Sequence, residues 1–295
     1  MWTYFNPVRV EFGGGSVIDT TKVFAAADGD FARVARFLET GIGAEALSAT
    51  PIIAVPTTAG TGSEVTCWAT VWNEADGKKF SLAHPDLYPE VALIDPALML
   101  GKPKTLTVST GLDAFSHALE SLWNVNANPV SANHAVFAAR EVLEVLPALV
   151  DDLQNLELRG RMARAATFAG LAFSNTKTAI AHSLSYPITL KHNVPHGIAC
   201  SFSLPIVIKS VSGVGGLFKE ALERIFEGGE DVAVAKVSAL LSSLGVSVKP
   251  FDHGVTDAEW RDLVDGAFDG ERGKNFIGEK DAFLRAAESF GAAAA

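Results

Sequence analysis

STGLDAFSHALESLW, residues 109–123, combines apolar residues at helical spacing with two side chains that can bind metal. Ser109 or Thr110 is expected to cap this helix. Asp113 and His117 then project from the same face, because they are four residues apart. Alone, such a pair is more often a solvated pair or a local hydrogen bond than half of a metal site. The segment therefore predicts a helix and offers two candidate ligands.

Two further histidines lie downstream in apolar surroundings. His182 lies on a predicted helix at 178–190, and His196 follows Pro195 at a predicted helix start. A single His of this kind is usually a hydrogen-bonded core residue, but one carboxylate with three imidazoles suits Fe²⁺ or Zn²⁺ and leaves positions for water or a substrate oxygen. We therefore expect one catalytic divalent metal, bound by Asp113, His117, His182 and His196.

The sequence before residue 102 has the pattern of an α/β domain. VRVEF at 8–12 alternates as a strand does, three glycines follow it, and VIDTTKVFAAA at 17–27 has a helical pattern. Apolar runs at 52–55 and 91–96 predict two more strands.

From Lys102 onward strand signals nearly vanish and long amphipathic segments follow. We therefore expect an α/β domain at 1–102 and an all-α, metal-binding catalytic domain at 103–295. The predicted helices are 109–123, 131–150, 157–174, 178–190, 198–210, 216–227, 231–243 and 256–267.

Composition excludes several classes of partner. The 24 Lys and Arg residues against 34 Asp and Glu give a net charge of −10, which opposes binding to nucleic acid and to anionic membrane surfaces. No apolar stretch reaches the roughly 18 residues of a membrane span. Cys67 and Cys200 lie far apart in sequence, and the N-terminus lacks a signal-peptide pattern, so we expect reduced thiols and a cytoplasmic location.

Two turns of small and hydroxyl-bearing residues follow predicted strands. A glycine run between a strand and a helix lets the backbone approach a phosphate, although a lone GGGS is more often a tight turn and is not the GxGxxG dinucleotide fingerprint. The first turn contains Gly13, Gly14, Gly15 and Ser16, and the second contains Thr57, Thr58, Gly60, Thr61 and Ser63.

Four segments together resemble the iron-containing (group III) alcohol dehydrogenase family. They are GGGSVID, PTTAGTGSE, GLDAFSHALES and AHSLSYPITLKHNVPHGIA, in the order and spacing of that family. The resemblance implies that Asp113, His117, His182 and His196 are the metal ligands. It also implies that the two turns hold the pyrophosphate and nicotinamide-ribose side of NAD(P), with Asp19 and Lys79 as further cofactor contacts.

One departure from the family concerns the first domain. Family members begin with a strand like NPVRVEFG and reach GGGS only after roughly two more strand–helix units, whereas this chain joins the two directly. We therefore expect a truncated Rossmann-like domain that lacks the adenosine-ribose side of the cofactor site. Each large apolar side chain exposed by this loss forfeits about 1.5–3 kcal/mol of burial, so we also expect a partner chain, as in a homodimer, or a rearranged domain.

The resemblance implies a metal-dependent, NAD(P)H-linked reduction of a small aldehyde to a primary alcohol. SYPITL, PHGIACSFSLP and SLAHPDLYP are most similar to the branch that reduces phosphonoacetaldehyde to 2-hydroxyethylphosphonate. Two alternatives stay open: a non-catalytic metal-binding homologue with impaired cofactor binding, and an enzyme like glycerol dehydrogenase or dehydroquinate synthase. The full ligand set of one Asp and three His argues against the second.

Candidate substrate residues flank the ligands. Many relatives have His where this chain has Tyr186, which is a candidate hydrogen-bond donor to the substrate. His192 is expected to line the site or to hydrogen-bond in a loop. Lys177 and Lys191 are candidates for binding a phosphonate, although surface lysines more often serve solubility.

Overall fold

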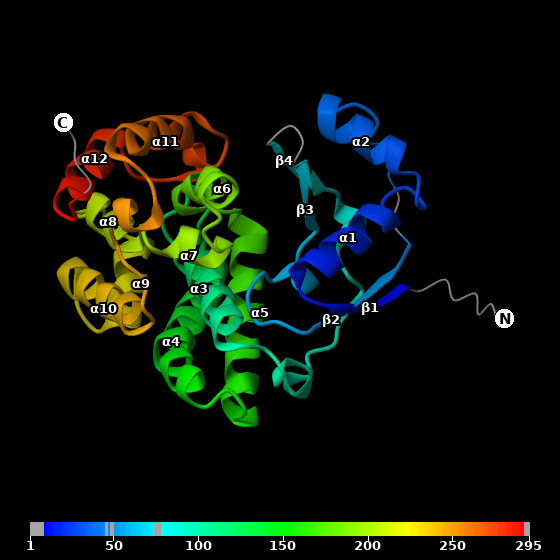
Figure 1. The fold of residues 1–295 in the computed structure, drawn as a ribbon, viewed down its shortest axis with the longest axis horizontal. Helices are drawn as coiled ribbons and strands as arrows, with labels where there is room; N and C mark the ends of the chain where they lie inside the picture. Colours follow the sequence, from blue (N-terminus) through cyan, green and yellow to red (C-terminus); the bar gives the residue numbers. More distant parts are fainter. Residues whose placement is uncertain (1–8, 45–46, 48–49, 74–77, 292–295) are drawn as a thin grey trace.

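Two structurally different parts follow one another along the chain (Figure 1). The computed structural model describes residues 9–44, 47, 50–73 and 78–291. Within these ranges every β-strand precedes residue 102, and the rest is helical. This confirms the fold class, a truncated Rossmann-like domain followed by an all-α domain. The position of the boundary at residue 102 stays a prediction.

A three-stranded parallel sheet lies in the first part. It contains β1 (Arg9–Gly13), β2 (Ile52–Pro56) and β5 (Val91–Ala92), in the order β1-β2-β5. β1 leads directly through the glycine run into α1 (Gly15–Ala25), which packs against β1 and β2. Because β1 and β2 are parallel neighbours, the two turns that follow them meet at the same edge of the sheet.

Three elements of this part are missing from the sequence-based prediction. β3 (Trp68–Asn73) and β4 (Lys78–Ala83) pair as antiparallel strands. Helix α2 (Phe31–Thr40) begins after Asp30, whose side chain caps it, and ends at Gly41 in the left-handed conformation. Asp and Gly at these two positions are ordinary helix start and stop signals, so α2 was recognisable from the sequence.

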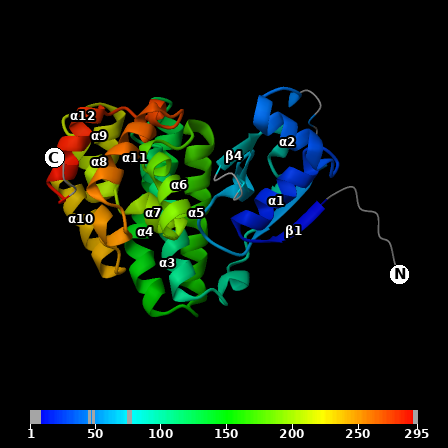
Figure 2. The ribbon, with the colours of Figure 1, turned by 45° about the horizontal axis from the view of Figure 1, so that its top comes forward.

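The second part packs around one large hydrophobic core. Figure 2 shows α3 to α6 between the α/β part and the C-terminal helices. The helices are α3 (Lys104–Glu120), α4 (Pro129–Asp151), α5 (Leu156–Thr176), α6 (Ile180–His192), α7 (His196–Ser201), α8 (Leu204–Ser210), α9 (Leu217–Phe226), α10 (Glu230–Ser243), α11 (Asp257–Asp269) and α12 (Lys280–Glu288). Short 3₁₀ turns are η2 (Ser63–Val65), η3 (Pro85–Leu87), η4 (Pro96–Met99), η5 (Pro250–His253) and η6 (Gly273–Asn275).

The start of α3 differs from the prediction. The helix begins at Lys104 after Pro103, so Ser109 and Thr110 lie inside it and do not cap it. Thr110 Oγ1 donates instead to the carbonyl oxygen of Leu106. Intrinsic propensity does not favour the threonines of this first turn, but the helix packs against α4, α5 and α7, and that tertiary packing outweighs propensity.

Two differences concern the C-terminal helices. The segment predicted as one helix at 198–210 forms α7 and α8, which are separated at residues 202–203. Pro205 lies in the first turn of α8 and has no amide hydrogen to continue α7. Helix α12 was not predicted, although its Phe283 is fully buried.

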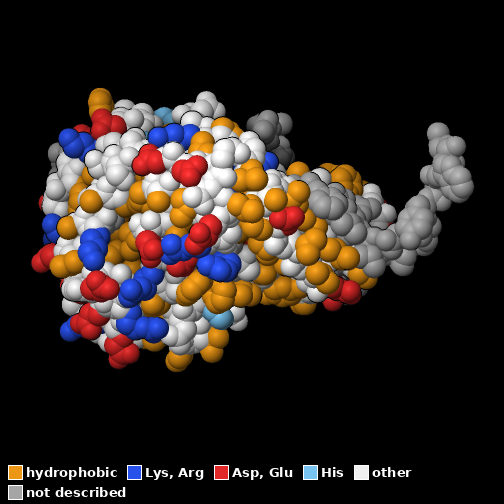
Figure 3. Space-filling view, turned by 90° about the horizontal axis from the view of Figure 1, so that it is seen from below, with side chains coloured by type: hydrophobic (Ala, Val, Ile, Leu, Met, Phe, Trp, Pro, Cys, Tyr) orange, Lys and Arg blue, Asp and Glu red, His pale blue; other side chains and the backbone are white. Residues whose placement is uncertain are grey.

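Apolar side chains are exposed on the α/β part, as the missing strand–helix units imply. Figure 3 shows hydrophobic side chains gathered over this end of the molecule. Val17 and Phe24 on α1 are 42% and 45% exposed, and Leu93 beside β5 is 54% exposed. In the part of the chain that the structure describes, no helix is both long and apolar enough to cross a membrane.

Candidate metal centre

Three helices bring the four predicted metal ligands together. Asp113 and His117 project from α3, His182 from α6 and His196 from the first position of α7. Asp113 Oδ1 lies 3.4 Å from Nε2 of His182 and 3.9 Å from Nε2 of both His117 and His196. Two ligands bound to one ion at about 2.0–2.2 Å can be no more than about 4.4 Å apart. The spacing around Asp113 therefore fits a shared metal ion.

A close crossing of α7 over α3 places His196 beside Asp113. A Cβ atom on Gly197 would lie 1.8 Å from the carbonyl oxygen of Ser109, so no larger residue fits there. His196 is the most open of the predicted ligands, with a side chain 34% exposed against 7% or less for the others. Access to the centre is therefore from the His196 side.

Buried polar atoms at the centre lack partners. Asp113 Oδ1 and His182 Nε2 have no hydrogen bond of acceptable geometry within the described residues, although both are buried. A buried polar group without a partner costs about 1–3 kcal/mol, and a carboxylate costs more. A metal ion would satisfy both atoms at once, so the donor set present fits a divalent cation.

Glu120 fixes the orientation of His182. It is fully buried on α3, and its Oε2 accepts a 2.6 Å hydrogen bond from Nδ1 of His182. Its Oε1 accepts from the backbone N–H groups of Ala181 at 2.6 Å and His182 at 3.2 Å. With the proton on Nδ1, Nε2 presents its lone pair to the centre, as second-sphere carboxylates do for metal-bound histidines. The sequence prediction missed this residue, although it lies seven residues after Asp113 and hence on the same helix face.

The protonation states of the four groups differ. Burial raises the pKa of Asp113, but the electrostatic interactions with the neighbouring histidines outweigh burial and hold the pKa below its usual range. Burial lowers the pKa of His117 to about 4. At neutral pH the carboxylate is therefore ionised and the His117 imidazole is neutral, the forms that bind metal. Burial lowers the pKa of His182 and of His196, but the charge of Cys200 outweighs burial and raises the pKa of His182, and it raises the pKa of His196 to about 9. A metal ion would therefore have to displace a proton from each of these two imidazoles.

A thiol that was not predicted as a site residue also faces the centre. Cys200 lies on α7 four residues after His196, and its Sγ is 3.5 Å from Nε2 of that histidine. Its donor atom belongs, with those of Asp113, His182 and His196, to a group in which all four atoms lie within 4.8 Å of one another. His117 lies 3.9 Å from Asp113 but is not part of this group. The sequence could have indicated Cys200 as a site residue, because it follows His196 by four residues and therefore shares its helix face.

Two cations lie against Tyr186 next to the centre. The Tyr186 ring stacks on His196, with centroids 5.6 Å apart. Lys79 Nζ, from β4, lies 3.6 Å from the centroid of the Tyr186 ring, and Arg272 Cζ lies 4.9 Å from it. Burial raises the pKa of Tyr186, but the two cations outweigh burial and lower the pKa to about 8. Arg272 comes from a distant segment and was not predicted.

Two of the other candidate substrate residues, Lys191 and His192, lie in the last turn of α6. Glu259 accepts hydrogen bonds from Lys191 Nζ at 2.6 Å and from Nε2 of His192 at 2.8 Å. The Lys177 side chain is exposed at the end of α5. A role for these residues toward the substrate stays a prediction.

The two turns predicted to bind the cofactor contact each other. A Cβ atom on Gly15 would lie 2.5 Å from Thr61, so a glycine is needed where the turns meet. Asp19 lies beneath them: its Oδ1 accepts from Ser63 Oγ at 2.6 Å, and its Oδ2 accepts from the backbone N–H of Thr70 at 2.8 Å. Asp19 on α1 therefore holds the second turn and the start of β3 in place through these two hydrogen bonds.

Lys22 is a fully buried lysine in the same region. Its Nζ donates to the carbonyl oxygens of Ser63 at 2.6 Å, Thr66 at 2.7 Å and Trp68 at 2.9 Å. These bonds tie α1 to the segment that follows the second turn. Burial lowers the pKa of Lys22 to about 8, although the charges of Asp19 and Glu64 oppose this shift.

This shift makes stability depend on pH. Between pH 8 and the ordinary lysine pKa of 10.5 the unfolded chain binds one more proton than the folded chain, so stability rises with pH in that window. From about pH 7.5 to about pH 9.5 the wild-type protein should gain about 1–2 kcal/mol relative to Lys22→Met. Urea unfolding of both proteins at the two pH values measures the difference. Parallel pH profiles would contradict the assignment.

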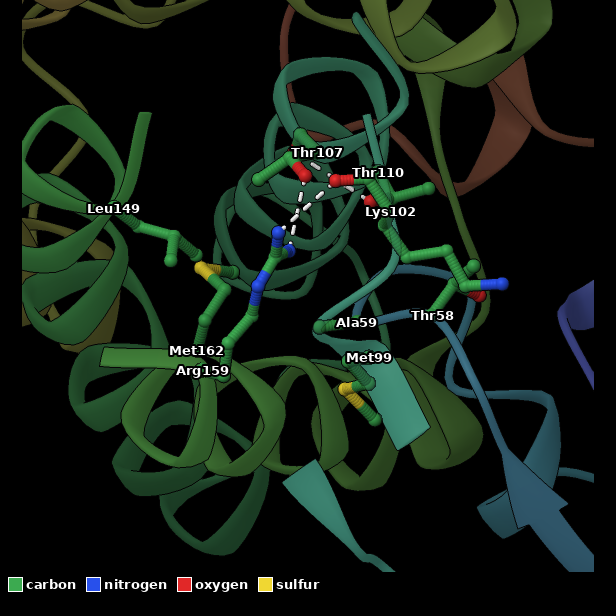
Figure 4. Close-up of a pocket in the computed structure, with 9 residues that line it drawn as sticks. All are labelled: Thr58, Ala59, Met99, Lys102, Thr107, Thr110, Leu149, Arg159 and Met162. Atoms are coloured by element: carbon green, nitrogen blue, oxygen red, sulfur yellow. Dashed lines mark hydrogen bonds between the residues drawn. The ribbon is translucent and has the colours of Figure 1, made fainter. Parts of the chain in front are cut away.

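A small pocket lies where the second turn meets α3 and α5 (Figure 4). Its volume is about 10 Å³, roughly that of one water position. Arg159 lines it and donates to Thr107 Oγ1 at 3.0 Å and to the carbonyl oxygen of Lys102 at 3.1 Å. The pocket is thus a packing feature between the two parts and has no room for a substrate.

Two family models match the chain. Residues 10–96 match the model described as iron-containing alcohol dehydrogenase. Residues 107–280 match the model described as the C-terminal part of the Fe-containing alcohol dehydrogenase family.

Individual relatives and solved structures agree with these models. The probable alcohol dehydrogenase EutG of Escherichia coli (strain K12) is 34% identical over 85% of this chain and 64% of its own length. The phosphonoacetaldehyde reductase of Streptomyces viridochromogenes is 36% identical over 67% of this chain and 51% of its own length. The chain thus spans about half to two thirds of the length of these relatives. The structure of sulfoacetaldehyde reductase from Bifidobacterium kashiwanohense with NAD⁺ superposes with a TM-score of 0.88 at 32% identity, covering 97% of this chain and 76% of that one.

Proposed function

Because the chain belongs to the iron-containing alcohol dehydrogenase family, we propose that it is a metal-dependent, NAD(P)H-linked enzyme that reduces a small aldehyde to a primary alcohol. One observation carries this proposal. Three imidazoles lie around one buried carboxylate, and the Asp113 and His182 atoms that face each other lack hydrogen-bond partners within the described residues. That arrangement has no use as a hydrogen-bond network but suits a cation.

In the proposed site, Asp113, His117, His182 and His196 would hold the ion, Fe²⁺ or Zn²⁺. When bound, a divalent metal supplies Lewis acidity toward the aldehyde oxygen, and NAD(P)H supplies the hydride. Glu120 accepts from Nδ1 of His182 and so would direct Nε2 of this imidazole toward the ion. The Tyr186 ring stacks on His196, the most exposed of the proposed ligands, and would therefore contact a substrate that reaches the ion from that side.

The cofactor proposal uses the two turns at the sheet edge. Backbone N–H groups of the first turn and the start of α1 suit a pyrophosphate, since helix N-termini favour anions. The related sulfoacetaldehyde reductase was solved with NAD⁺, which supports a nicotinamide cofactor for this chain. The remaining proposed contacts are Gly13, Gly14, Gly15, Ser16, Asp19, Thr57, Thr58, Gly60, Thr61, Ser63 and Lys79. We also propose a homodimer, because a second copy would cover the exposed apolar side chains of α1 and β5.

An aldehyde with an anionic group is the proposed substrate class, with phosphonoacetaldehyde as the leading candidate. Lys79 and Arg272 lie against Tyr186 beside the centre and offer positive charge there. Hydrogen bonds from Arg272 to Thr178 Oγ1 at 3.1 Å and Ser81 Oγ at 3.2 Å hold its guanidinium in place. A phosphonoacetaldehyde reductase and a sulfoacetaldehyde reductase among the relatives support this class.

Replacing Arg272 tests the substrate proposal. Arg272→Ala should raise KM for phosphonoacetaldehyde by about 10–100-fold, the equivalent of one charge-assisted hydrogen bond, and should change KM for propanal much less. Lys191→Ala is the matched comparison, because Lys191 is bound to Glu259 and its side chain is 67% exposed. Steady-state kinetics with both aldehydes measure the effects. Equal changes for the two aldehydes in Arg272→Ala would argue against anion recognition there.

Two alternatives are separable from this proposal. A degenerate metal-binding homologue would keep one metal per chain but show no saturable fluorescence change with NADH or NADPH. An enzyme like glycerol dehydrogenase would oxidise a vicinal diol with NAD⁺ in preference to reducing a simple aldehyde. Fluorescence titration with both cofactors, followed by NAD(P)H consumption with phosphonoacetaldehyde, propanal and glycerol/NAD⁺ as substrates, decides among the three. Absence of cofactor binding with metal retained would overturn the dehydrogenase proposal.

A further inference from the structure

Cys200 is positioned like a ligand rather than like an ordinary core cysteine. It lies on the same face of α7 as His196, as His117 and Asp113 share a face of α3. Its side chain is fully buried, and its Sγ is 3.5 Å from Nε2 and 3.7 Å from Nδ1 of His196. The thiol therefore lies at the imidazole of a proposed metal ligand.

A second observation points to a ligand at the same place. Within the described residues, His182 Nε2 and Asp113 Oδ1 have no hydrogen-bond partner, and each is at most about 2–4% exposed. The donor atoms of these two residues, His196 and Cys200 all lie within 4.8 Å of one another. This spacing is close to the limit of about 4.4 Å for two ligands of one ion, so small side-chain shifts would bring nitrogen, oxygen and sulfur donors to one ion, with zinc–sulfur bonds of about 2.3 Å.

We propose that the thiolate of Cys200 is an additional ligand of the metal, beside Asp113, His117, His182 and His196. This inference rests on the proposed function, because it concerns the same centre. The thiol loses its proton to the buffer as the sulfur–metal bond forms. Carboxylate and thiolate together neutralise a divalent ion, and a soft sulfur donor favours Zn²⁺ or Co²⁺ over Fe²⁺. The site therefore takes a borderline divalent ion, with zinc preferred to iron.

The chain contains a matched control. A buried free cysteine often acts only as a small apolar side chain. Cys67 is a free, partly buried cysteine that packs against the small hydrophobic core of the α/β part and does not belong to the donor group. Replacing Cys67 changes the thiol count in the same way as replacing Cys200, without touching the centre.

Cobalt substitution gives a direct readout. Wild-type, Cys67→Ser and Cys200→Ser proteins are loaded anaerobically with Co²⁺, and their absorption spectra and cobalt content are measured. We expect one cobalt per chain and visible d–d bands in all three. A near-ultraviolet thiolate-to-cobalt charge-transfer band should appear in the wild type and Cys67→Ser and be lost in Cys200→Ser. Cys200→Ala serves as a second variant if the serine protein does not fold.

The outcomes separate this inference from the proposed function. A charge-transfer band that survives in Cys200→Ser, or one that is absent from wild-type protein holding one cobalt, overturns the thiolate ligand and leaves the metal centre standing. Failure of the wild type to bind cobalt overturns the metal centre itself. Competition between Zn²⁺ and Fe²⁺ adds a second readout: the zinc-to-iron occupancy ratio should fall by about tenfold or more in Cys200→Ser. An unchanged ratio also counts against the proposal.

Discussion

Asp113→Asn should lose the bound metal and lower kcat/KM by about 10³-fold or more, because Lewis-acid stabilisation by a bound ion amounts to several kcal/mol. Asp113 has this effect because its Oδ1 is the atom around which His117, His182 and His196 are arranged at 3.4–3.9 Å. Asparagine keeps the shape of the side chain but removes the negative charge. Metal analysis of the dialysed protein and aldehyde-reduction kinetics measure the two losses.

The control for this variant is Asp151→Asn, which changes an exposed aspartate at the end of α4. It should retain wild-type metal content and activity. Far-ultraviolet circular dichroism should show the same helical content in both variants, since the substitution at Asp113 removes no packing volume. Full metal occupancy in Asp113→Asn would contradict the central role of this carboxylate.

Replacing Glu120 should separate stability from metal binding. Glu120→Ala leaves two buried backbone N–H groups and the His182 ring without an acceptor, at about 1–3 kcal/mol for each unsatisfied group, so we expect a loss of about 3–5 kcal/mol in the free energy of unfolding. Denaturant unfolding measures this loss. Metal affinity should also fall, by about 10–100-fold.

Glu120→Gln distinguishes an electrostatic from a purely structural role. A glutamine can still accept from the two N–H groups, so the loss of stability should be much smaller than in the alanine variant. Its amide group would donate to Nδ1 of His182, which moves the imidazole proton to Nε2 and blocks metal binding there. We therefore expect near-normal stability with weakened metal affinity. Glu144→Gln, at a side chain 69% exposed, is the control. Wild-type metal affinity in Glu120→Gln would contradict the tautomer argument.

Local sequence patterns predicted much of the centre because its residues come in short-range pairs. Spacing of four residues put Asp113 and His117 on one helix face, and Pro195 marked the start of the helix that carries His196. Helical spacing also places Glu120, seven residues after Asp113, and Cys200, four residues after His196, on the faces that carry the proposed ligands. Only the structure could bring the three helices together, since no local pattern encodes the close crossing at Gly197.

Of the two cationic residues beside the centre, Lys79 was expected as a cofactor contact, whereas Arg272 was beyond local prediction. Lys191 was one candidate for binding an anionic substrate, beside the more common role of a surface lysine in solubility. In the structure its Nζ donates to Glu259 on α11, and a role toward the substrate stays a prediction. Arg272 is distant from every ligand in sequence and reaches Tyr186 only through the packing of η6 against α6. The burial of Lys22 could not be predicted from its helical surroundings, because it depends on the carbonyl oxygens of the segment after the second turn.

The number of metal ions bound per chain tests the central claim most directly. Wild-type protein is saturated anaerobically with Fe²⁺ or Zn²⁺, dialysed, and analysed for metal by inductively coupled plasma mass spectrometry against protein concentration. The arrangement of Asp113, His117, His182 and His196 predicts one tightly held ion per chain. Protein that retains no divalent metal after dialysis, while folded and with its helical content intact, would contradict it.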